Sequence, residues 1–434
     1  MKKISFSTQI NAPASRVWST LWNDLSYRAW TTVFHEGSCA ESDWQEGSKI
    51  LFGDGSGNGM TSRIARLIPN QFMSFEHLGE IKEGVEDFET AKTHGWSGAL
   101  ENYTLEEKNG GTALVVEMDA DDNFEDYFKD KFPIALAKVK ALAEGGKITP
   151  FLWFDRQAEE AVKLYTSIFA DSTINQVLRN GDAVLTVGFT LGGQAFAALN
   201  GGPMFKLNPS ISFFVVCETE AEADAVWAEL LKGGEVMMPY DKYEWSEKYG
   251  WLNDRYGVSW QISYGKIADV GQKFTPTLMF TGEQQGRAEE AINFYTSLFK
   301  DSSVSGILRY GPEDPDPDGT IKHAQFQLDG QVFMAMDSAM PHAFQFNEAL
   351  SFVINCDTQK EIDYYWNKLT ADGGAESMCG WLKDKFGVSW QVVPPVLSQM
   401  LGSPDAAKSQ RVLEAMMQMK KLDIGVLKAA FEGA

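Results

Sequence analysis

Two stretches of the sequence share a pattern of aromatic, acidic and amide residues that could bind a small organic molecule. Residues 250–261 read GWLNDRYGVSWQ and residues 380–391 read GWLKDKFGVSWQ, with nine of twelve positions identical. After each glycine, Val and Trp alternate with Ser and Gln, which predicts a strand with one apolar and one polar face. Aromatic walls with one placed amide suit a small organic ligand, although the same tryptophans could simply fill a core. The candidate binding residues are Trp251, Gln261, Trp381 and Gln391.

Two arginines occupy equivalent places at the ends of strand-like segments, Arg179 in RNGDA and Arg309 in RYGPE. Each could contact an anionic ligand. Each could instead pair with an acid of the repeated motif, Asp254 or Asp384, and serve the structure alone. Both interpretations stay open.

The repeated motif belongs to a longer duplication. AEEAVKLYTSIFADS at 158–172 matches AEEAINFYTSLFKDS at 288–302, and further matches follow in the same order. Residues 147–268 and 273–397 are therefore two copies of one domain. Within each copy the order strand, helix, strands occurs twice, which predicts paired βαβββ units.

This arrangement resembles the vicinal oxygen chelate (glyoxalase/bleomycin resistance) superfamily. The segments TPTLMF, AEEAINFYTSLFKDS and CGWLKDKFGVSWQVVP of the second copy resemble its PhnB-like branch, named after demethylubiquinone methyltransferase. The first copy follows the same pattern but drifts from it. Since such domains commonly pair, we expect intrachain pairing of the two repeats in place of a homodimer, with a homodimer of the chain still possible.

Residues 1–146 share none of this pattern. INAPASRVWSTLWN predicts a helix, several strand-like segments follow, and NFEDYFKDKFPIALAKVKALAE predicts a long last helix. NAPASRVW and ENYTL resemble the START/Bet v 1-like (SRPBCC) superfamily, in its branch related to Hsp90-ATPase activators. The resemblance implies a helix-grip fold, so the whole chain is of the α+β class, with a helical tail over 398–434. The candidate ligand-binding residues of the first domain, which could equally be core, are Trp30, Trp44 and Tyr103.

Vicinal oxygen chelate enzymes usually hold a divalent ion with His and Glu on the first and last strands of the paired units. The corresponding segments here contain no His or Glu, and only Asn200 and Asp337 stand at their ends. A site of two histidines and one carboxylate cannot be assembled from them, so we expect no metal. Because no Gly-rich turn links a strand to a helix as nucleotide-like cofactors require, we also expect no cofactor and reject a methyltransferase role.

The composition limits the other partners. Lys and Arg total 38 against 60 Asp and Glu, a net charge of −22, and such a chain repels phosphate backbones and anionic lipids. With no apolar run of the roughly 20 residues that a membrane span needs, we expect a cytoplasmic protein without nucleic-acid or membrane partners. Its expected function is small-molecule binding in metal-free cavities, of sequestration or sensing type. A metal-dependent lyase or isomerase of small oxygenated substrates, or a chaperone-docking module, stays open as an alternative.

Overall fold

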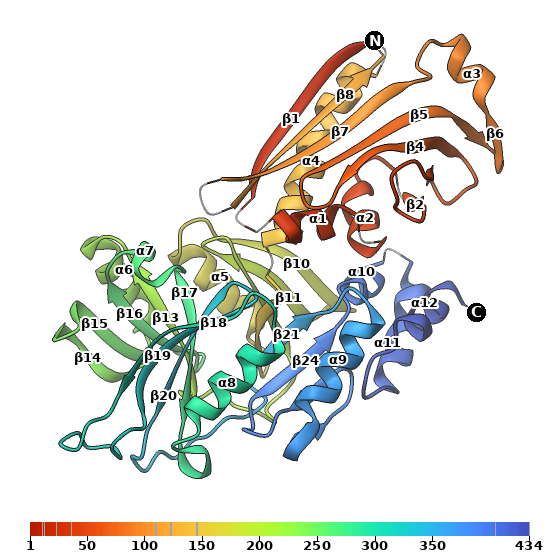
Figure 1. The fold of residues 1–434 in the computed structure, drawn as a ribbon. Helices are drawn as coiled ribbons and strands as arrows, with labels where there is room; N and C mark the ends of the chain where they lie inside the picture. The colour runs from red at the N-terminus through yellow and green to blue at the C-terminus, as the bar shows by residue number, and fades with distance from the viewer. Residues whose placement is uncertain are drawn as a thin grey trace. The chain divides into compact units, whose positions relative to one another are not determined.

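The computed structural model describes residues 1–10, 12, 14–22, 24–35, 37–108, 111–121, 124–144, 146–403 and 405–433. The chain divides into two compact units, Met1–Gly145 and Gly146–Ala434 (Figure 1). No helix in these ranges is both long and apolar enough to cross a membrane.

The N-terminal unit is an antiparallel sheet of eight strands with helices against one face. Its strands follow the order β1-β8-β7-β5-β4-β3-β2, with β6 paired to β5. The long helix α4 contacts β1, α1 and α2, and buried apolar residues such as Val17, Phe75 and Val139 join helices and sheet in one core. This is the predicted helix-grip arrangement. Its elements are β1 (Lys2–Ile10), α1 (Ala14–Trp22), α2 (Asp24–Thr31), β2 (Cys39–Glu41), β3 (Lys49–Gly53), β4 (Gly59–Ile68), β5 (Phe72–Lys82), β6 (Val85–Asp87), α3 (Phe88–Thr93), β7 (Ala99–Lys108), β8 (Gly111–Ala120) and α4 (Glu125–Glu144).

The C-terminal unit contains two sheets of eight strands, which we call sheet I and sheet II. Sheet I has the order β10-β11-β12-β9-β21-β24-β23-β22, and sheet II the order β14-β15-β16-β13-β17-β20-β19-β18. The strands of sheet I are β9 (Ile148–Phe154), β10 (Thr173–Asn180), β11 (Ala183–Leu191), β12 (Gln194–Asn200), β21 (Leu350–Asn355), β22 (Ala375–Glu376), β23 (Trp381–Lys383) and β24 (Ser389–Val393). Those of sheet II are β13 (Ile211–Cys217), β14 (Glu235–Tyr243), β15 (Ser246–Asn253), β16 (Ser259–Tyr264), β17 (Phe274–Phe280), β18 (Ser303–Arg309), β19 (Ile321–Leu328) and β20 (Gln331–Asp337).

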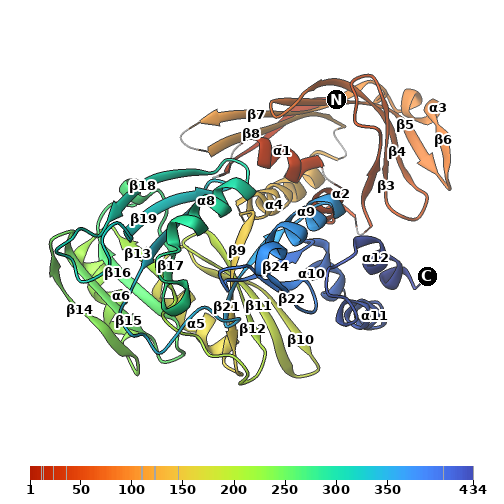
Figure 2. The same cartoon turned by 60° about the horizontal axis from the view of Figure 1, so that its bottom comes forward.

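Each sheet combines one βαβββ unit from each repeat. In sheet I the first unit of the first copy joins the second unit of the second copy through antiparallel pairing of β9 with β21. In sheet II the remaining two units join through β13 and β17. Figure 2 shows β9 and β24 close together in one sheet, although more than two hundred residues separate them. The predicted fold class is confirmed, and each unit finds its strand partner in the other repeat.

The helices of the unit follow from the apolar spacing of their sequences. In α5 the residues Ala158, Ala161, Val162 and Tyr165 are buried on one face, and the matching residues of α8 are buried as well. Thr219 caps α6 by accepting a hydrogen bond from the Glu222 amide over 3.1 Å. The helices are α5 (Ala158–Ile168), α6 (Glu220–Leu230), α7 (Ile267–Val270), η1 (Gly282–Gln284), α8 (Ala288–Leu298), α9 (Gln359–Leu369), η2 (Ala371–Gly373), α10 (Val396–Leu401), α11 (Ala406–Met417) and α12 (Ile424–Glu432).

The segment between α11 and α12 packs on the second repeat, whereas the end of α10 lies against β10 of the first. The amides of Cys379 and Gly380 donate to the carbonyls of Met419 and Lys420, each over 2.7 Å. Leu422 is fully buried. The tail therefore covers the turn before β23, where the first repeat carries the longer hairpin of β14 and β15.

Candidate functional site

The aspartate of the repeated motif is the centre of a buried hydrogen-bonded cluster. Asp254 Oδ2 accepts from the Tyr165 hydroxyl over 2.7 Å and from Trp260 Nε1 over 2.9 Å. Its Oδ1 accepts from the amides of Tyr256 and Val258 over 2.8 and 3.0 Å. Burial nevertheless raises the pKa of Asp254 above its ordinary value. The carboxylate thus holds the turn into β16 and ties it to α5.

The second repeat builds the same cluster. Asp384 accepts from the Tyr295 hydroxyl over 2.6 Å, from Trp390 Nε1 over 2.8 Å, and from the amides of Phe386 and Val388 over 2.9 and 3.1 Å. Burial raises the pKa of Asp384 to about 6 in spite of these four donors. The motif is repeated because each of its two turns needs this acceptor, which is a structural role.

The two candidate arginines form surface ion pairs with acids other than those of the motif. Arg179 Nη2 lies 2.8 Å from Glu159 Oε2, and Arg309 Nη2 lies 2.7 Å from Glu289 Oε1. Each arginine side chain is more than two-fifths exposed. Pairing with the motif aspartates, one of the two interpretations from the sequence, is therefore not what the structure shows. A role of either arginine in anion binding stays a prediction.

The two candidate glutamines are buried and hydrogen-bonded within their sheets. Gln261 is 6% exposed, donates to Ser212 Oγ over 2.7 Å, and accepts from the Tyr249 hydroxyl over 2.7 Å. Gln391 is 5% exposed and donates to Ser351 Oγ over 3.0 Å. They form a polar face opposite the apolar one, as the alternation predicted, and their contact with a ligand stays a prediction.

The two candidate tryptophans of the motif are placed differently. Trp251 Nε1 donates to Ser259 Oγ over 2.7 Å and is buried. The ring of Trp381 instead lies 6.0 Å from that of Trp153, at 83°. Ser389, the counterpart of Ser259, has a buried hydroxyl without a hydrogen-bond partner in the described ranges. Ligand binding by either tryptophan stays a prediction.

The candidate residues of the N-terminal unit lie in or beside its core. Trp30 is 2% exposed and donates to the Leu21 carbonyl over 3.1 Å. Trp44 is half-buried, with its ring 5.8 Å from that of Trp22. Tyr103 is 2% exposed, and burial raises its pKa well above the ordinary value, with further contributions from a neighbouring carboxylate. Their role as ligand contacts also stays a prediction.

Tyr103 belongs to a buried polar network across three strands. Its hydroxyl donates to Glu101 Oε1 over 2.5 Å, and Glu101 Oε2 lies 3.3 Å from His77 Nε2. His77 Nδ1 lies 2.8 Å from Ser62 Oγ. The network crosslinks β4, β5 and β7 beneath the aromatic core.

The residues at the positions of a family metal do not fit one. Asn200 Oδ1 accepts from the Ala158 amide over 2.9 Å, and Asp337 accepts from the amides of Gly286 and Ile321 over 2.8 and 2.9 Å. Both side chains thus secure their own strand ends. Across the described residues, no three His, Cys, Asp or Glu side chains come together in a geometry that could hold an ion. The chelating set that the fold family implies is therefore not present in these parts of the chain.

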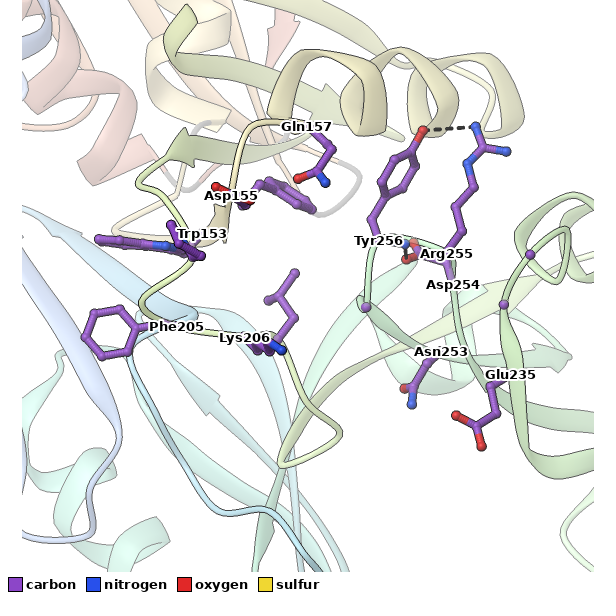
Figure 3. Close-up of a pocket in the computed structure, with 16 residues that line it drawn as sticks. Trp153, Asp155, Gln157, Phe205, Lys206, Glu235, Asn253, Asp254, Arg255 and Tyr256 are labelled. Carbon is purple, nitrogen blue, oxygen red and sulfur yellow. Dashed lines mark hydrogen bonds between the residues drawn. The ribbon is translucent and has the colours of Figure 1, made fainter.

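A pocket of about 510 Å³ opens between the two βαβββ units of the first repeat (Figure 3). One wall consists of the end of β9 and the connection between the two units. The opposite wall consists of the beginning of β14 and the turn that follows β15. Figure 3 shows Trp153, Phe205 and Lys206 on one side and Asn253 and Glu235 on the other. The lining residues are Trp153, Phe154, Asp155, Gln157, Pro203, Phe205, Lys206, Leu207, Gly233, Gly234, Glu235, Asn253, Asp254, Arg255, Tyr256 and Gly257.

The second repeat carries larger side chains at two equivalent places. Where the first repeat has Leu207, the second has Phe346, which is buried and packs against Phe280 with ring centroids 5.1 Å apart. Where the first has Gln157, the second has Arg287. Arg287 reaches the Lys385 carbonyl over 3.3 Å and lies over a phenylalanine ring at 4.6 Å. The contacts of Arg287 cross from one unit to the other, as the hydrogen bond from the Tyr256 hydroxyl to Glu160 does in the first repeat.

None of the sequence-predicted residues lines this pocket. The signal that could have found it is the pattern of mismatches between the repeats. Asn253 differs from its counterpart within an otherwise matching segment, whereas Gln157 stands beside an insertion and Leu207 in a stretch where the repeats match weakly. Differences of this kind indicate positions where the side chains of the two repeats pack differently.

Comparisons with known proteins agree with this architecture. The family model described as 3-demethylubiquinone-9 3-methyltransferase matches residues 146–263 and 272–393, more than half of the sequence. The chain therefore belongs to this family. A second family model, described as activator of Hsp90 ATPase homolog 1-like protein, matches residues 11–144. The predicted resemblances to a START/SRPBCC-like domain and two PhnB-like domains are thus confirmed.

Solved structures match the parts singly. A putative 3-demethylubiquinone-9 3-methyltransferase, PhnB protein, from Bacillus cereus is 40% identical over 27% of this chain and 98% of its own, with a TM-score of 0.26. A protein from Staphylococcus aureus is 37% identical over 28% of this chain and 97% of its own, with a TM-score of 0.13. The Aha1 dimer from Colwellia psychrerythraea is 21% identical over 33% of this chain and 97% of its own, with a TM-score of 0.27. A search of the curated proteins found no match.

Proposed function

We propose that the chain is a small-molecule-binding protein of sequestration or sensing type, and that its site is the pocket of the first repeat. Both matched domain families are small-molecule-binding families. The pocket volume of about 510 Å³ lies within the range that small organic ligands occupy. The family name does not assign methyl transfer to this chain, since the segments expected to bind such a cofactor are missing from the sequence.

One observation carries the proposal: the pocket of the first repeat lies at a junction whose side chains differ between the two repeats. The second repeat places Phe346 and Arg287 there, whereas the first has the smaller Leu207 and Gln157. In the first repeat Gln157 turns back, and its Oε1 accepts from the Arg156 amide over 3.0 Å. Smaller side chains leave space at the junction, and the atoms around that space lose dispersion contacts. A bound ligand can supply those contacts.

The test introduces the two larger side chains of the second repeat at the equivalent positions of the first repeat. Native mass spectrometry of freshly purified protein, followed by a screen of small molecules by calorimetry, first identifies ligands of the unmodified chain. The variant Gln157→Arg/Leu207→Phe should then lose at least about ten-fold in affinity for them, because its side chains occupy the pocket. The chain tolerates both residues at the equivalent positions of its second repeat, so the variant is expected to fold.

The mirror change Phe346→Leu in the second repeat is the control. It removes packing from the junction of the second repeat and should leave ligand affinity within about two-fold of that of the unmodified protein. Equal affinity of the Gln157→Arg/Leu207→Phe variant and the unmodified chain would contradict the proposed site.

A further inference from the structure

Two acceptor oxygens that line this pocket are buried without a hydrogen-bond partner. They are Oδ1 of Asp155 and Oδ1 of Asn253, both without a hydrogen bond as far as the described ranges extend. Asp155 Oδ1 forms an ion pair with Nε of Arg156 at 3.8 Å, beyond hydrogen-bond distance, and the two side chains are 43% and 89% exposed. The Asn253 amide donates only to Met237 Sδ, over 3.4 Å. Buried acceptors are normally satisfied, so these two oxygens, on side chains that are only partly buried, are positions where a ligand donor could bind.

The second repeat provides an internal comparison at the same two positions. Asp155 corresponds to Thr281, whose hydroxyl donates to the Phe344 carbonyl over 3.0 Å. Asn253 corresponds to Lys383, which pairs with Glu348 at 2.8 Å. In the second repeat the two positions carry donors, and both donors have partners within the protein. In the first repeat the same two positions carry acceptor oxygens that receive no hydrogen bond in the described ranges.

The remaining charges of the pocket favour a cation. Glu235 adds an exposed carboxylate to the wall that carries Asn253. Arg255 is already engaged, because it donates to the Tyr256 hydroxyl over 2.9 Å, lies 4.0 Å from Glu160 and packs over the Tyr256 ring. Lys206 is the lining cation left over, and it is exposed to solvent.

The pocket also has an aromatic wall. The rings of Trp153 and Phe205 are 5.1 Å apart and nearly perpendicular. Trp153 is held in place by its own hydrogen bond from Nε1 to the Gly202 carbonyl over 2.8 Å. Gly201 and the Trp381 ring also pack against the indole, so Trp153 and Phe205 give the pocket an apolar edge.

We propose that the pocket of the first repeat binds a small organic cation that carries N–H donors at two ends, such as a short diamine. One end donates to Asp155 beside the aromatic wall, and the other donates to Asn253 and Glu235 on the opposite wall. This inference rests on the proposed function and adds the chemical class of the ligand. No covalent step is involved.

The test compares three probes of one shape. They are para-xylylenediamine, the neutral 1,4-benzenedimethanol and the dianion terephthalate, each titrated into the full chain by calorimetry. The diammonium probe should bind at least about ten-fold more tightly than the diol, and terephthalate more weakly than either. Equal or tighter binding of the diol or of terephthalate would overturn the cation assignment.

Variants taken from the second repeat locate the site. Asp155→Thr and Asn253→Lys should each weaken diammonium binding about ten-fold or more, and should change diol binding by less than about three-fold. Lys206→Ala removes a like charge from the pocket and should strengthen diammonium binding instead. An unchanged diammonium affinity in both Asp155→Thr and Asn253→Lys would overturn the site.

The two proposals fail differently. If the diol binds as well as the diammonium probe and Gln157→Arg/Leu207→Phe abolishes both, the pocket binds small molecules and only the ligand class is wrong. If no probe binds and native mass spectrometry shows only the bare chain, both proposals are wrong.

Discussion

Tyr165 on α5 donates a hydrogen bond to Asp254 over 2.7 Å and so joins a helix on sheet I to a turn of sheet II. The second repeat forms the same bond in the opposite sense. Tyr295 on α8, a helix on sheet II, donates over 2.6 Å to Asp384 in a turn of sheet I. Strand pairing therefore joins the two repeats, and these tyrosine–aspartate bonds join the two units within each repeat.

Removal of either hydroxyl should destabilise the C-terminal unit measurably. Tyr295→Phe leaves Asp384 buried with one donor fewer, and hydrogen bonds to charged groups contribute about 2 kcal/mol. We expect Tyr165→Phe and Tyr295→Phe each to lower the free energy of unfolding by about that amount, measured by urea titration. The partly exposed Tyr264 serves as a control. A loss for Tyr264→Phe as large as that for the two buried tyrosines would contradict the interpretation.

The raised pKa of Asp384 should make its contribution to stability fall with rising pH. Its folded pKa is about 6 against an ordinary value of 3.8, so the folded state binds the proton more tightly. The contribution is fully present below about pH 4 and is lost as pH rises through about 6, with an upper limit of about 3 kcal/mol. The difference in unfolding free energy between unmodified protein and Asp384→Asn should therefore decrease from pH 4 to pH 7.

Asp363 provides a control, because its contribution to stability should change with pH in the opposite direction. It pairs with Lys421 at 2.6 Å, and that hydrogen bond lowers its pKa. Its contribution is lost as pH falls, so the corresponding difference for Asp363→Asn should be small and should increase with pH. Parallel pH profiles for the two aspartates would show that Asp384 does not titrate as expected.

A single repeat should be unable to complete its sheets as a monomer. In residues 273–397 alone, β17 lacks β13 and β21 lacks β9, so two central strand edges are exposed. Two such fragments can pair β17 of one with β21 of the other. We expect a dimer by light scattering coupled to size exclusion, with a mass twice that of the fragment. A folded, monodisperse monomer would show that the pairing between repeats is dispensable.

The network of Glu101 should stabilise the N-terminal unit. Glu101→Gln removes the carboxylate and replaces one of its two acceptor oxygens by a donor, so the Tyr103 hydroxyl and an Nε2–H of His77 can no longer both donate to this side chain. We expect the unfolding free energy of this unit to fall by about 1–3 kcal/mol, observed in the full chain by scanning calorimetry. The exposed Glu106→Gln is the matched control and should change it by less than about 0.5 kcal/mol.

Local patterns in the sequence predicted the units of this fold correctly. The order of strand-like and helix-like segments predicted the βαβββ units, and the alternation around Trp260 predicted a strand with an apolar and a polar face. These properties depend on neighbours within about ten residues, which periodicity records. The duplication could also be found from the sequence, because the two copies share identical residues in the same order.

The choice of partner for each unit was decided by the tertiary structure. Pairing within a repeat and pairing between repeats place the same apolar faces of β9, β13, β17 and β21 against a helix layer, so the sequence pattern fits both. The observed choice joins Ile148–Phe154 to Leu350–Asn355 across some two hundred residues. No local signal encodes such a distant contact.

The sequence by itself determined the two kinds of domain, the duplication and the residue types at every turn and strand face. The tertiary structure decided what those residues contact: Asp254 binds a tyrosine and an indole instead of an arginine, and Gln261 finds a serine. It also decided where the pocket lies, because Asp155, Leu207 and Asn253 come from three separate segments that meet only in the folded chain. A pocket is a property of the space between segments, and that space depends on packing that periodicity does not record.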